Sequence, residues 1–380
     1  MIGQVRAAHV DISLGGQSYG SQLAPYLITA AYEDNCDGRK ADDFSLELAD
    51  RDGKFISTWM PKKGATFEAS IIAERWFAPI ASDITLKCGR FWIDTVEFIL
   101  PDHKVTIKGA SLPTDARLKA SSETRGWDDT SLQDIAQQIA GENNMTLDWQ
   151  AKVNPRYSRT EMHSESSLGF LMKRANDAKL AIKVKDGKII VFDEQTLEEA
   201  GPAFTLIYGD MGITGVAVGG ACYRMSAGHF VTKIMDTTKA AQVLRSDPTT
   251  GDTGSGQWNA PDGELEDNTE DKVNEDTDAE TGEGDSVGDP SLREGEMESQ
   301  WNTDEASDLK AKSHVRDKNK KKDQCRIELS IGNPLVAAGQ TFNLMGCGQF
   351  DGKWFIESAH HQVAPEYKTE LTVRKCLEGY

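Results

Sequence analysis

The sequence lacks the long apolar run that a membrane-spanning helix needs. Its most apolar stretch, Met211 to Cys222, is short and is interrupted by four glycines, whereas a transmembrane helix needs about 20 consecutive apolar residues. Residues 1–20 contain no basic stretch followed by an apolar core, so no secretory signal is evident there. We therefore expect synthesis in the cytoplasm and no stable insertion into a membrane.

Cysteine pairs and catalytic motifs are also missing. The six cysteines occur without a CxxC pair, which argues against a zinc site or a disulfide framework and favours free thiols. No GxSxG, HExxH, P-loop or GxGxxG sequence occurs. Glu161 and Glu165 could form a glycosidase dyad, but Glu165 is better explained as an acid near a helix N-terminus. The sequence predicts no catalytic residue, no cofactor and no metal.

Two weaker hints of metal binding have simpler explanations. His360 and His361 are adjacent, but neighbouring side chains of a strand point to opposite faces. One interior and one surface histidine is therefore favoured over a metal pair. Asp276 to Glu280 resembles the start of a calcium loop, yet Thr281 and Val287 stand where an EF-hand needs Gly and Glu. Only weak, nonspecific cation binding is expected there.

The net charge of −19 is concentrated in one segment. Residues 246–310 hold 21 acidic and three basic residues, so the rest of the chain is nearly neutral. A segment this polar cannot bury enough apolar surface to offset its chain entropy, which predicts disorder or a loose loop. The basic run Lys318 to Lys322 is interpreted as a solvated helix end and not as a nucleic-acid contact. No specific binding of nucleic acid is expected.

Residues 1–110 show a β pattern. Phe44, Leu46 and Leu48 alternate with polar or small residues, which is typical of a half-buried strand. Turn-forming residues follow at Asp50 to Gly53, and a further turn is expected at Asp34 to Gly38. Six short strands with turns at this spacing favour a small barrel or sandwich. The expected strands are 26–33, 44–48, 66–74, 84–88, 91–100 and 105–109.

Residues 111–203 show an α+β pattern. Thr130 to Gln133 fits a capping box with Gln133 at the third helical position, and apolar residues then recur at helical spacing from Leu132 to Ala140. A second helix is expected from about Ser166, with Leu168, Leu171, Met172 and Ala175 on one face. A hairpin around Lys185 to Lys188 follows.

The β pattern returns at Phe204 and again after the acidic segment. We therefore predict a second β domain made of residues 204–240 and 323–380, interrupted by an acidic insertion, 241–322, that ends in a short helix. The expected fold class is α+β and mainly β.

Five segments in this order resemble the late control protein D family, the baseplate hub proteins of contractile phage tails and related injection systems. Three departures from the family pattern, at Met162, Ser167 and Asn176, leave the apolar register intact. The segments are Ala41 to Gly53, Gly89 to Glu97, Arg125 to Leu132, Ser164 to Ala175, and Trp354 to His360 with Tyr367 to Leu371.

The resemblance implies two related β-barrels per chain and a homotrimer that forms a ring of six barrels. Such a structural hub would join a sixfold tail tube, or a tube-initiator protein, to a threefold spike, would contact the tape-measure protein, and would belong to the tail baseplate or injection particle. The family motifs single out residues for which core packing is the expected role: Trp127, Thr130, Glu165, Phe170, Leu171, Arg174, Trp354 and His360.

Two other functions stay open at this point. One is a tail-associated cell-wall hydrolase, although no folded segment is left over for a catalytic module. The other is a binding module that recruits a basic partner through the acidic segment.

Overall fold

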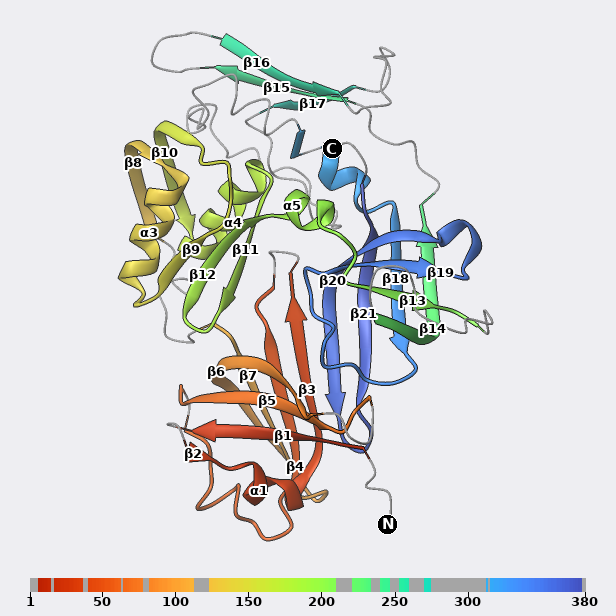
Figure 1. The fold of residues 1–380 in the computed structure, drawn as a ribbon. Coiled ribbons are helices and arrows are strands. Elements are labelled where there is room, and N and C mark those ends of the chain that lie inside the picture. The colour runs from red at the N-terminus through yellow and green to blue at the C-terminus, as the bar shows by residue number, and fades with distance from the viewer. Residues whose placement is uncertain are drawn as a thin grey trace.

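The computed structural model describes most of the chain outside the acidic insertion. The described residues are 6–14, 17–36, 40–62, 64–77, 82–112, 123–209, 221–233, 312–313 and 315–377, together with the backbone of three short strands within the insertion. They form two β units and a middle α+β unit beside them (Figure 1).

The first β unit, called the first barrel below, is a curved sheet with the strand order β3-β4-β7-β6-β5-β1-β2. Phe44, Leu46 and Leu48 point into its core, which confirms the predicted alternation. Its elements are β1 (Ala7–Leu14), β2 (Gln17–Ser18), α1 (Gly20–Leu23), β3 (Leu27–Asn35), β4 (Asp43–Ala49), β5 (Thr66–Glu74), β6 (Ile84–Ile99) and β7 (Lys104–Ala110).

Three local predictions for this unit need correction. β1 was not predicted. The two strands expected at 84–88 and 91–100 are one strand, β6, which continues through Gly89 at a φ of 112°. Asp34 and Asn35, expected in a turn, end β3 instead and are buried. The ion pair and hydrogen bond that compensate the burial of Asp34 are described below, and Asn35 donates its side-chain amide to the carbonyl oxygen of Ala41 at 3.0 Å.

The middle unit packs two helices against short sheets. The predicted hairpin is confirmed as β11 (Leu180–Lys185) and β12 (Lys188–Asp193), which β9 (Thr146–Trp149) extends in parallel. A separate ribbon pairs β8 with β10. The remaining elements are β8 (Glu123–Ser131), α3 (Leu132–Glu142), β10 (Arg156–Glu165), α4 (Ser167–Asp177) and α5 (Glu194–Glu199).

The capping box of α3 is present, but it begins one residue later than predicted. Ser131, not Thr130, accepts from the backbone of Asp134, and the Asp134 carboxylate accepts from the Ser131 backbone. Thr130 is still paired with Tyr157 in the β8–β10 ribbon. The ribbon itself ends one residue later, where Ser131 lies opposite Arg156, so the helix begins at Leu132 and Ser131 is the residue in position to cap it.

The second β unit, the second barrel, is closed. Its strands run in the order β19-β13-β14-β18-β21-β20, and β20 pairs back to β19. The predicted strand at Thr341 to Met345 is confirmed without change. The strands are β13 (Phe204–Ile207), β14 (Ala221–Thr232), β18 (Asp323–Leu329), β19 (Thr341–Met345), β20 (Gly352–Val363) and β21 (Lys368–Lys375).

The two barrels repeat one topology. Numbered by chain order within each barrel, with the two-residue β2 left out, the strands run 2-3-6-5-4-1 in both. In the second barrel strand 2 (β14) pairs with strand 1, whereas β1 and β3 are not paired in the described part of the first barrel. Both barrels therefore have the same architecture, and the first is open at one seam.

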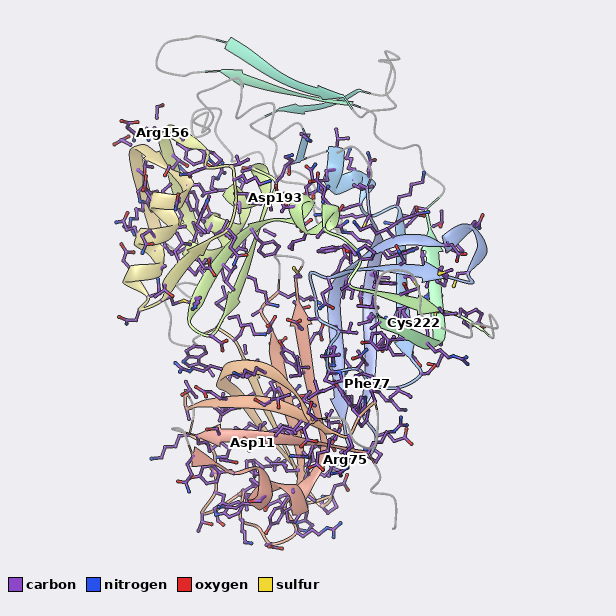
Figure 2. The ribbon with its side chains drawn as sticks, in the orientation of Figure 1. Asp11, Arg75, Phe77, Arg156, Asp193 and Cys222 are labelled. Carbon is purple, nitrogen blue, oxygen red and sulfur yellow. The ribbon has the colours of Figure 1, made fainter. Side chains whose placement is uncertain are left out.

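The barrels are joined into one 13-stranded sheet because β20 pairs antiparallel with β3. Two further contacts support this arrangement. Trp76 donates its indole N–H to the carbonyl oxygen of Gly332, and Phe77 stacks on Tyr223 of β14 with ring centroids 5.8 Å apart. Figure 2 shows Phe77 between the two barrels.

The insertion interrupts the β14–β18 hairpin. Thr232 pairs with Asp323, and the Lys233 N–H donates to the carbonyl oxygen of Lys322. The predicted helix before β18 is present at 315–319. Within the insertion, β15 (Ala240–Ser246), β16 (Thr253–Asn259) and β17 (Glu270–Asn274) form a small sheet that the sequence pattern did not indicate. The remaining residues of the predicted disordered segment, and the glycines from Gly212 to Gly220, lie outside the described residues.

No helix in the described part of the chain is long and apolar enough to cross a membrane.

Candidate functional site at the junction of the barrels

The junction between the barrels consists of six paired positions. Residues Ala30 to Asn35 of β3 lie opposite Ser358 to Val363 of β20, and His361 lies opposite Tyr32. The two rings stack with centroids 6.1 Å apart and an interplanar angle of 18°. The junction is therefore a continuous β-ladder with an aromatic pair at its centre.

His361 is fully buried and is held in a neutral form. Its Nε2 lies 3.1 Å from the carbonyl oxygen of Val336, which can only accept, so Nε2 carries the proton. Its Nδ1 then accepts from the Tyr367 hydroxyl at 2.9 Å. Burial lowers the pKa of His361 from its ordinary value of 6.5 to about 4. Its neighbour His360 is half-buried, so the predicted split between an interior and a surface histidine is what the strand produces.

An ionic cluster attaches the middle unit to the junction. Lys183 of β11 forms ion pairs with Asp34 and with Asp42, the latter at 3.3 Å. The Lys185 Nζ lies 4.0 Å from Asp42 and 3.1 Å from the Tyr32 hydroxyl. The second barrel completes the cluster, since the Ala338 N–H donates to Asp34 at 2.9 Å. One buried cluster thus binds all three units to each other.

Burial and charge act against each other in this cluster. Burial raises the pKa of Asp42 to about 6, although Lys183 opposes the rise. Burial also acts to raise the pKa of Asp34, but Lys183 and Lys185 hold it below its ordinary value. Burial acts to lower the pKa of Lys183, and the two aspartates raise it to about 12. The lysine is therefore charged, and its removal would leave two buried carboxyl groups poorly compensated.

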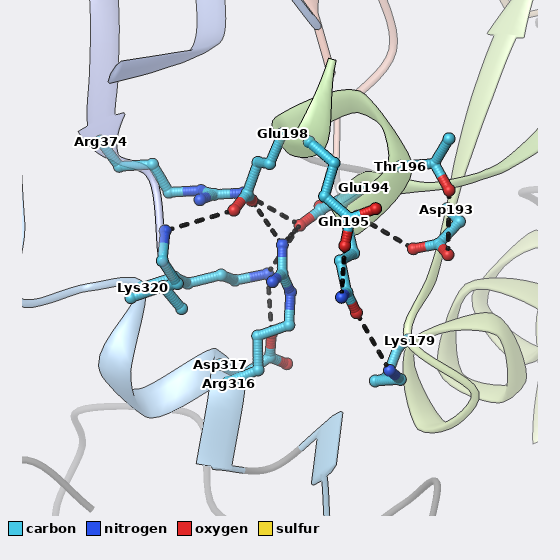
Figure 3. A network of polar contacts seen from close by, with 12 residues as sticks. Lys179, Asp193, Glu194, Gln195, Thr196, Glu198, Arg316, Asp317, Lys320 and Arg374 are labelled. Carbon is cyan, nitrogen blue, oxygen red and sulfur yellow. Dashed lines mark hydrogen bonds and ion pairs between the residues drawn. The ribbon is translucent and has the colours of Figure 1, made fainter. Parts of the chain in front are cut away.

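A second network fixes the end of the insertion (Figure 3). Glu198 of α5 forms ion pairs with Arg374 of β21 and with Arg316, which precedes β18. Glu194 adds contacts at 3.2 Å to Arg374 and 3.5 Å to Lys320. Lys320, expected in a solvated helix end, is instead largely buried and paired. These ion pairs hold α5, the second barrel and the helix at the end of the insertion together.

Four of the residues singled out by the motifs lie together in the core of the middle unit. The rings of Trp127 and Phe170 stack with centroids 5.2 Å apart, and Leu171 is fully buried beside them. Arg174 is buried as well, with an ion pair to Asp177 at 3.2 Å and its guanidinium 5.7 Å from the Phe170 ring. These side chains pack inside the unit.

The other four singled-out residues are dispersed. Trp354 is fully buried in the second barrel and donates to the Phe350 carbonyl oxygen at 2.9 Å. His360 lies in the junction ladder between Glu33 and Glu370. Thr130 and Glu165 are half-buried in the β8–β10 ribbon, and Glu165 ends β10 before the helix begins. The structure does not bring these eight residues into one site.

Sequence reasoning missed the charged residues that hold the units together. The available signal was a charged residue inside an otherwise apolar strand pattern, as at Lys183; β21, which holds Arg374, has a mostly polar sequence and gave no such signal. Among the described residues, no group of three or more His, Cys, Asp or Glu side chains is placed to hold a metal ion. What this arrangement can do chemically is to fix the relative positions of three units.

The sequence matches no protein-family profile and no curated protein. Similar structures do exist. The tail protein from Neisseria meningitidis MC58 is 12% identical, with a TM-score of 0.64 and 97% of each chain covered. The 43 kDa tail protein of prophage MuSo2 from Shewanella oneidensis is 12% identical, with a TM-score of 0.62, 97% of this chain and 98% of that chain covered.

A third similar structure comes from a secretion machine. It is a component of the type VI secretion system of E. coli, itself described as similar to the T4 bacteriophage tail proteins gp27 and gp5. It is 10% identical, with a TM-score of 0.53, and the match covers 97% of this chain and 78% of that chain. The chain therefore has the fold of phage tail proteins and of a related component of the type VI secretion system.

Proposed function

We propose that this chain is a structural hub of a contractile phage tail or a related injection device, and that it acts without catalysis. The observation that carries the proposal is the duplicated barrel: two units of one topology are joined edge to edge in a single sheet. Three copies of such a chain supply six similar barrels. A ring of this kind suits a sixfold tube on one side and a threefold spike on the other.

The three hydrophobic cores support a division into three domains. The proposed domains are the first barrel at 1–110, the middle domain at 111–203, and the second barrel at 204–240 with 323–380, while 241–322 is an insertion. Each of the three units has its own cluster of buried residues. The proposed partners are a spike protein, a tail-tube or tube-initiator protein and the tape-measure protein, as in the hubs that the sequence resembles.

The direct test is the molar mass of the purified chain in solution, measured by light scattering alone and after mixing with its neighbouring spike protein. The expected mass is three times 41.7 kDa in one or both samples. A monomer in both samples would contradict the hub and favour a binding module.

A deletion separates the hub from a recruiting module that uses the acidic segment. Removal of residues 246–300 leaves the β14–β18 ladder and the helix at 315–319 in place. A hub without this segment should still assemble, whereas a recruiter should lose its basic partner. Loss of the trimer on deletion would show that the insertion takes part in assembly.

A further inference from the structure

We propose that the free edge of β14 pairs with the free edge of β6 in a second copy of the chain, in the register of the β3–β20 junction. Gly228 to Lys233 of one copy would lie antiparallel to Thr95 to Leu100 of the next. This inference rests on the trimer proposed above and names the surfaces that build it.

β14 occupies in the second barrel the place of β3 in the first. β3 has a bulge between Leu27 and Thr29 where it pairs with β4, and β14 has one between Met225 and Ala227 where it pairs with β18. Counting from the bulges, Gly228 corresponds to Ala30 and Phe230 to Tyr32. The segment of β3 that binds β20 therefore has a counterpart at 228–233.

β6 occupies in the first barrel the place of β20 in the second. Ile93 donates to the carbonyl of Ala65 and accepts from the N–H of Gly64. Ile356 of the second barrel repeats both bonds, since it donates to the carbonyl of Gln340 and accepts from the N–H of Gly339.

The bulges of these two strands correspond as well, and so do the glycines that donate to them. The ladder with the following strand is shifted after Ile93 in β6 and after Ile356 in β20. Gly64 and Gly339, which make the equivalent hydrogen bonds, both have positive φ. Thr95 to Leu100 is therefore the counterpart of Ser358 to Val363.

Within the described residues, both counterparts have an unpaired edge. β14 pairs with β13 only from Ala221 to Arg224, and the rest of the strand pairs with β18 alone. β6 pairs with β5 only up to Trp92, and from Thr95 onward it pairs with β7 alone. An unpaired edge presents N–H and C=O groups to any strand of suitable register.

The exposure of these segments differs from that of their counterparts in the junction. Val231 is 43% exposed, Ile99 39% and Leu100 64%, although such side chains favour burial. The corresponding stretch of β20 is buried or half-buried throughout. Pairing of the two edges would cover the apolar side chains of both strands.

The proposed register places matching groups opposite each other. Phe98 of one copy lies opposite Phe230 of the next, at the position where His361 lies opposite Tyr32 within the chain. In the β14–β18 ladder, Lys233 makes a hydrogen bond to the β18 side. Because bonding alternates along a strand, the backbone groups of Phe230 point to the free edge. The ladder would thus have a central aromatic pair, as the junction has.

This contact joins two different edges, so it is heterologous and must close into a ring or continue as a filament. In a closed trimer, β3–β20 junctions within each chain alternate with β14–β6 junctions between chains. All six barrels then have equivalent neighbours, which is the geometry that a sixfold tube requires.

The test is a disulfide across the predicted ladder in the full-length chain. Glu97→Cys and Val231→Cys are introduced together, with Cys222, the exposed thiol, replaced by Ser. The pair would occupy a non-hydrogen-bonded position, where Cα atoms lie about 4.5–5 Å apart, within disulfide range. Mild oxidation should give covalent dimers and trimers on a non-reducing gel, and no band larger than the trimer should appear. The matched control is Asp128→Cys with Val231→Cys, since Asp128 is exposed but lies in the middle unit; it should give no trimer band.

A charge-swap experiment tests the same pairing without cysteines. Val231→Glu would face Glu97 of the next copy, and like charges directly opposite each other destabilise a ladder. The variant should dissociate into folded monomers, and the added substitution Glu97→Lys should restore the trimer. A trimer that neither cross-links nor responds to Val231→Glu would overturn this interface and leave the hub intact. A parent chain that is monomeric under all conditions would overturn both.

Discussion

The ring of His361 in the second barrel stacks on the ring of Tyr32 in the first, 6.1 Å away, at the centre of the ladder that joins the two barrels. The histidine is neutral, because both ring nitrogens have partners that suit one tautomer and burial penalises the charged form. The junction is therefore sensitive to the protonation of one interior side chain.

This histidine should give the chain a pH-dependent stability. The pKa of His361 is about 4 in the folded state and 6.5 when unfolded, so the unfolded state binds more protons between these values. The contribution of His361 to the free energy of unfolding should therefore rise with pH across this window by about 3 kcal/mol and be complete above it. His361→Gln should flatten this rise, as measured by urea unfolding at several pH values.

Comparing the parent chain with the His361→Gln variant isolates the effect of His361 on stability. Asp42 acts in the opposite sense, because its pKa is raised to about 6 in the folded state and its effect on stability falls as pH rises from 3.8. It is present in both proteins and cancels in the difference. A difference that does not change with pH would show that folding does not lower the pKa of His361.

Removal of Lys183 should strongly destabilise the junction. Lys183→Met leaves Asp34 and Asp42 buried with weaker compensation, and the loss of one partner of a buried pair costs about 3–5 kcal/mol. The double variant with Asp34→Asn should recover part of the loss, because one buried charge is removed as well. Thermal unfolding of the three proteins gives the comparison. Equal stability of the single and double variants would argue against the ion pair.

The position of the α3 cap can be tested with adjacent residues. Ser131→Ala removes the side chain that accepts from the Asp134 N–H and should cost about 1 kcal/mol. Thr130→Ala, one residue earlier, should cost less, because Thr130 does not cap the helix. Chemical denaturation measures both, and the reverse order of effects would restore the cap predicted from sequence.

The network around Glu198 should control how firmly the end of the insertion is held. Arg316→Ala removes the partner of Glu198 supplied by the helix before β18, so that helix should detach more readily. Limited proteolysis should then cut within residues 312–320 several times faster than in the parent. Arg326→Ala, which removes an exposed ion pair to Glu370, is the matched control and should leave the rate unchanged. Equal rates in both variants would mean that the network does not hold this helix.

Local patterns were sufficient to find most strands and both longer helices. The alternation at Phe44, Leu46 and Leu48 and the spacing from Leu132 to Ala140 follow directly from burying one face of a strand or helix. Errors occurred where neighbours in space decided the outcome. Asp34 has turn-forming character, but contacts from Lys183 and Ala338 retain it at the end of a strand.

The candidate site was harder to predict than the fold. Its charged partners are far apart in the sequence, as with Arg374 and Glu198, and no local spacing signals that they meet. The motif residues were easier to find, and Trp127, Phe170 and Leu171 lie in the core of the middle unit, the role expected for them.

The sequence by itself determined the mainly β fold class, the concentration of negative charge in one segment and the order of the elements, because periodicity and composition are local properties. Only the tertiary structure decided that two barrels share one topology, that β20 joins them through β3, and that two strand edges are left unpaired within the described residues. These features depend on pairing between distant segments, in which the backbone contributes the hydrogen bonds and the side chains select the register.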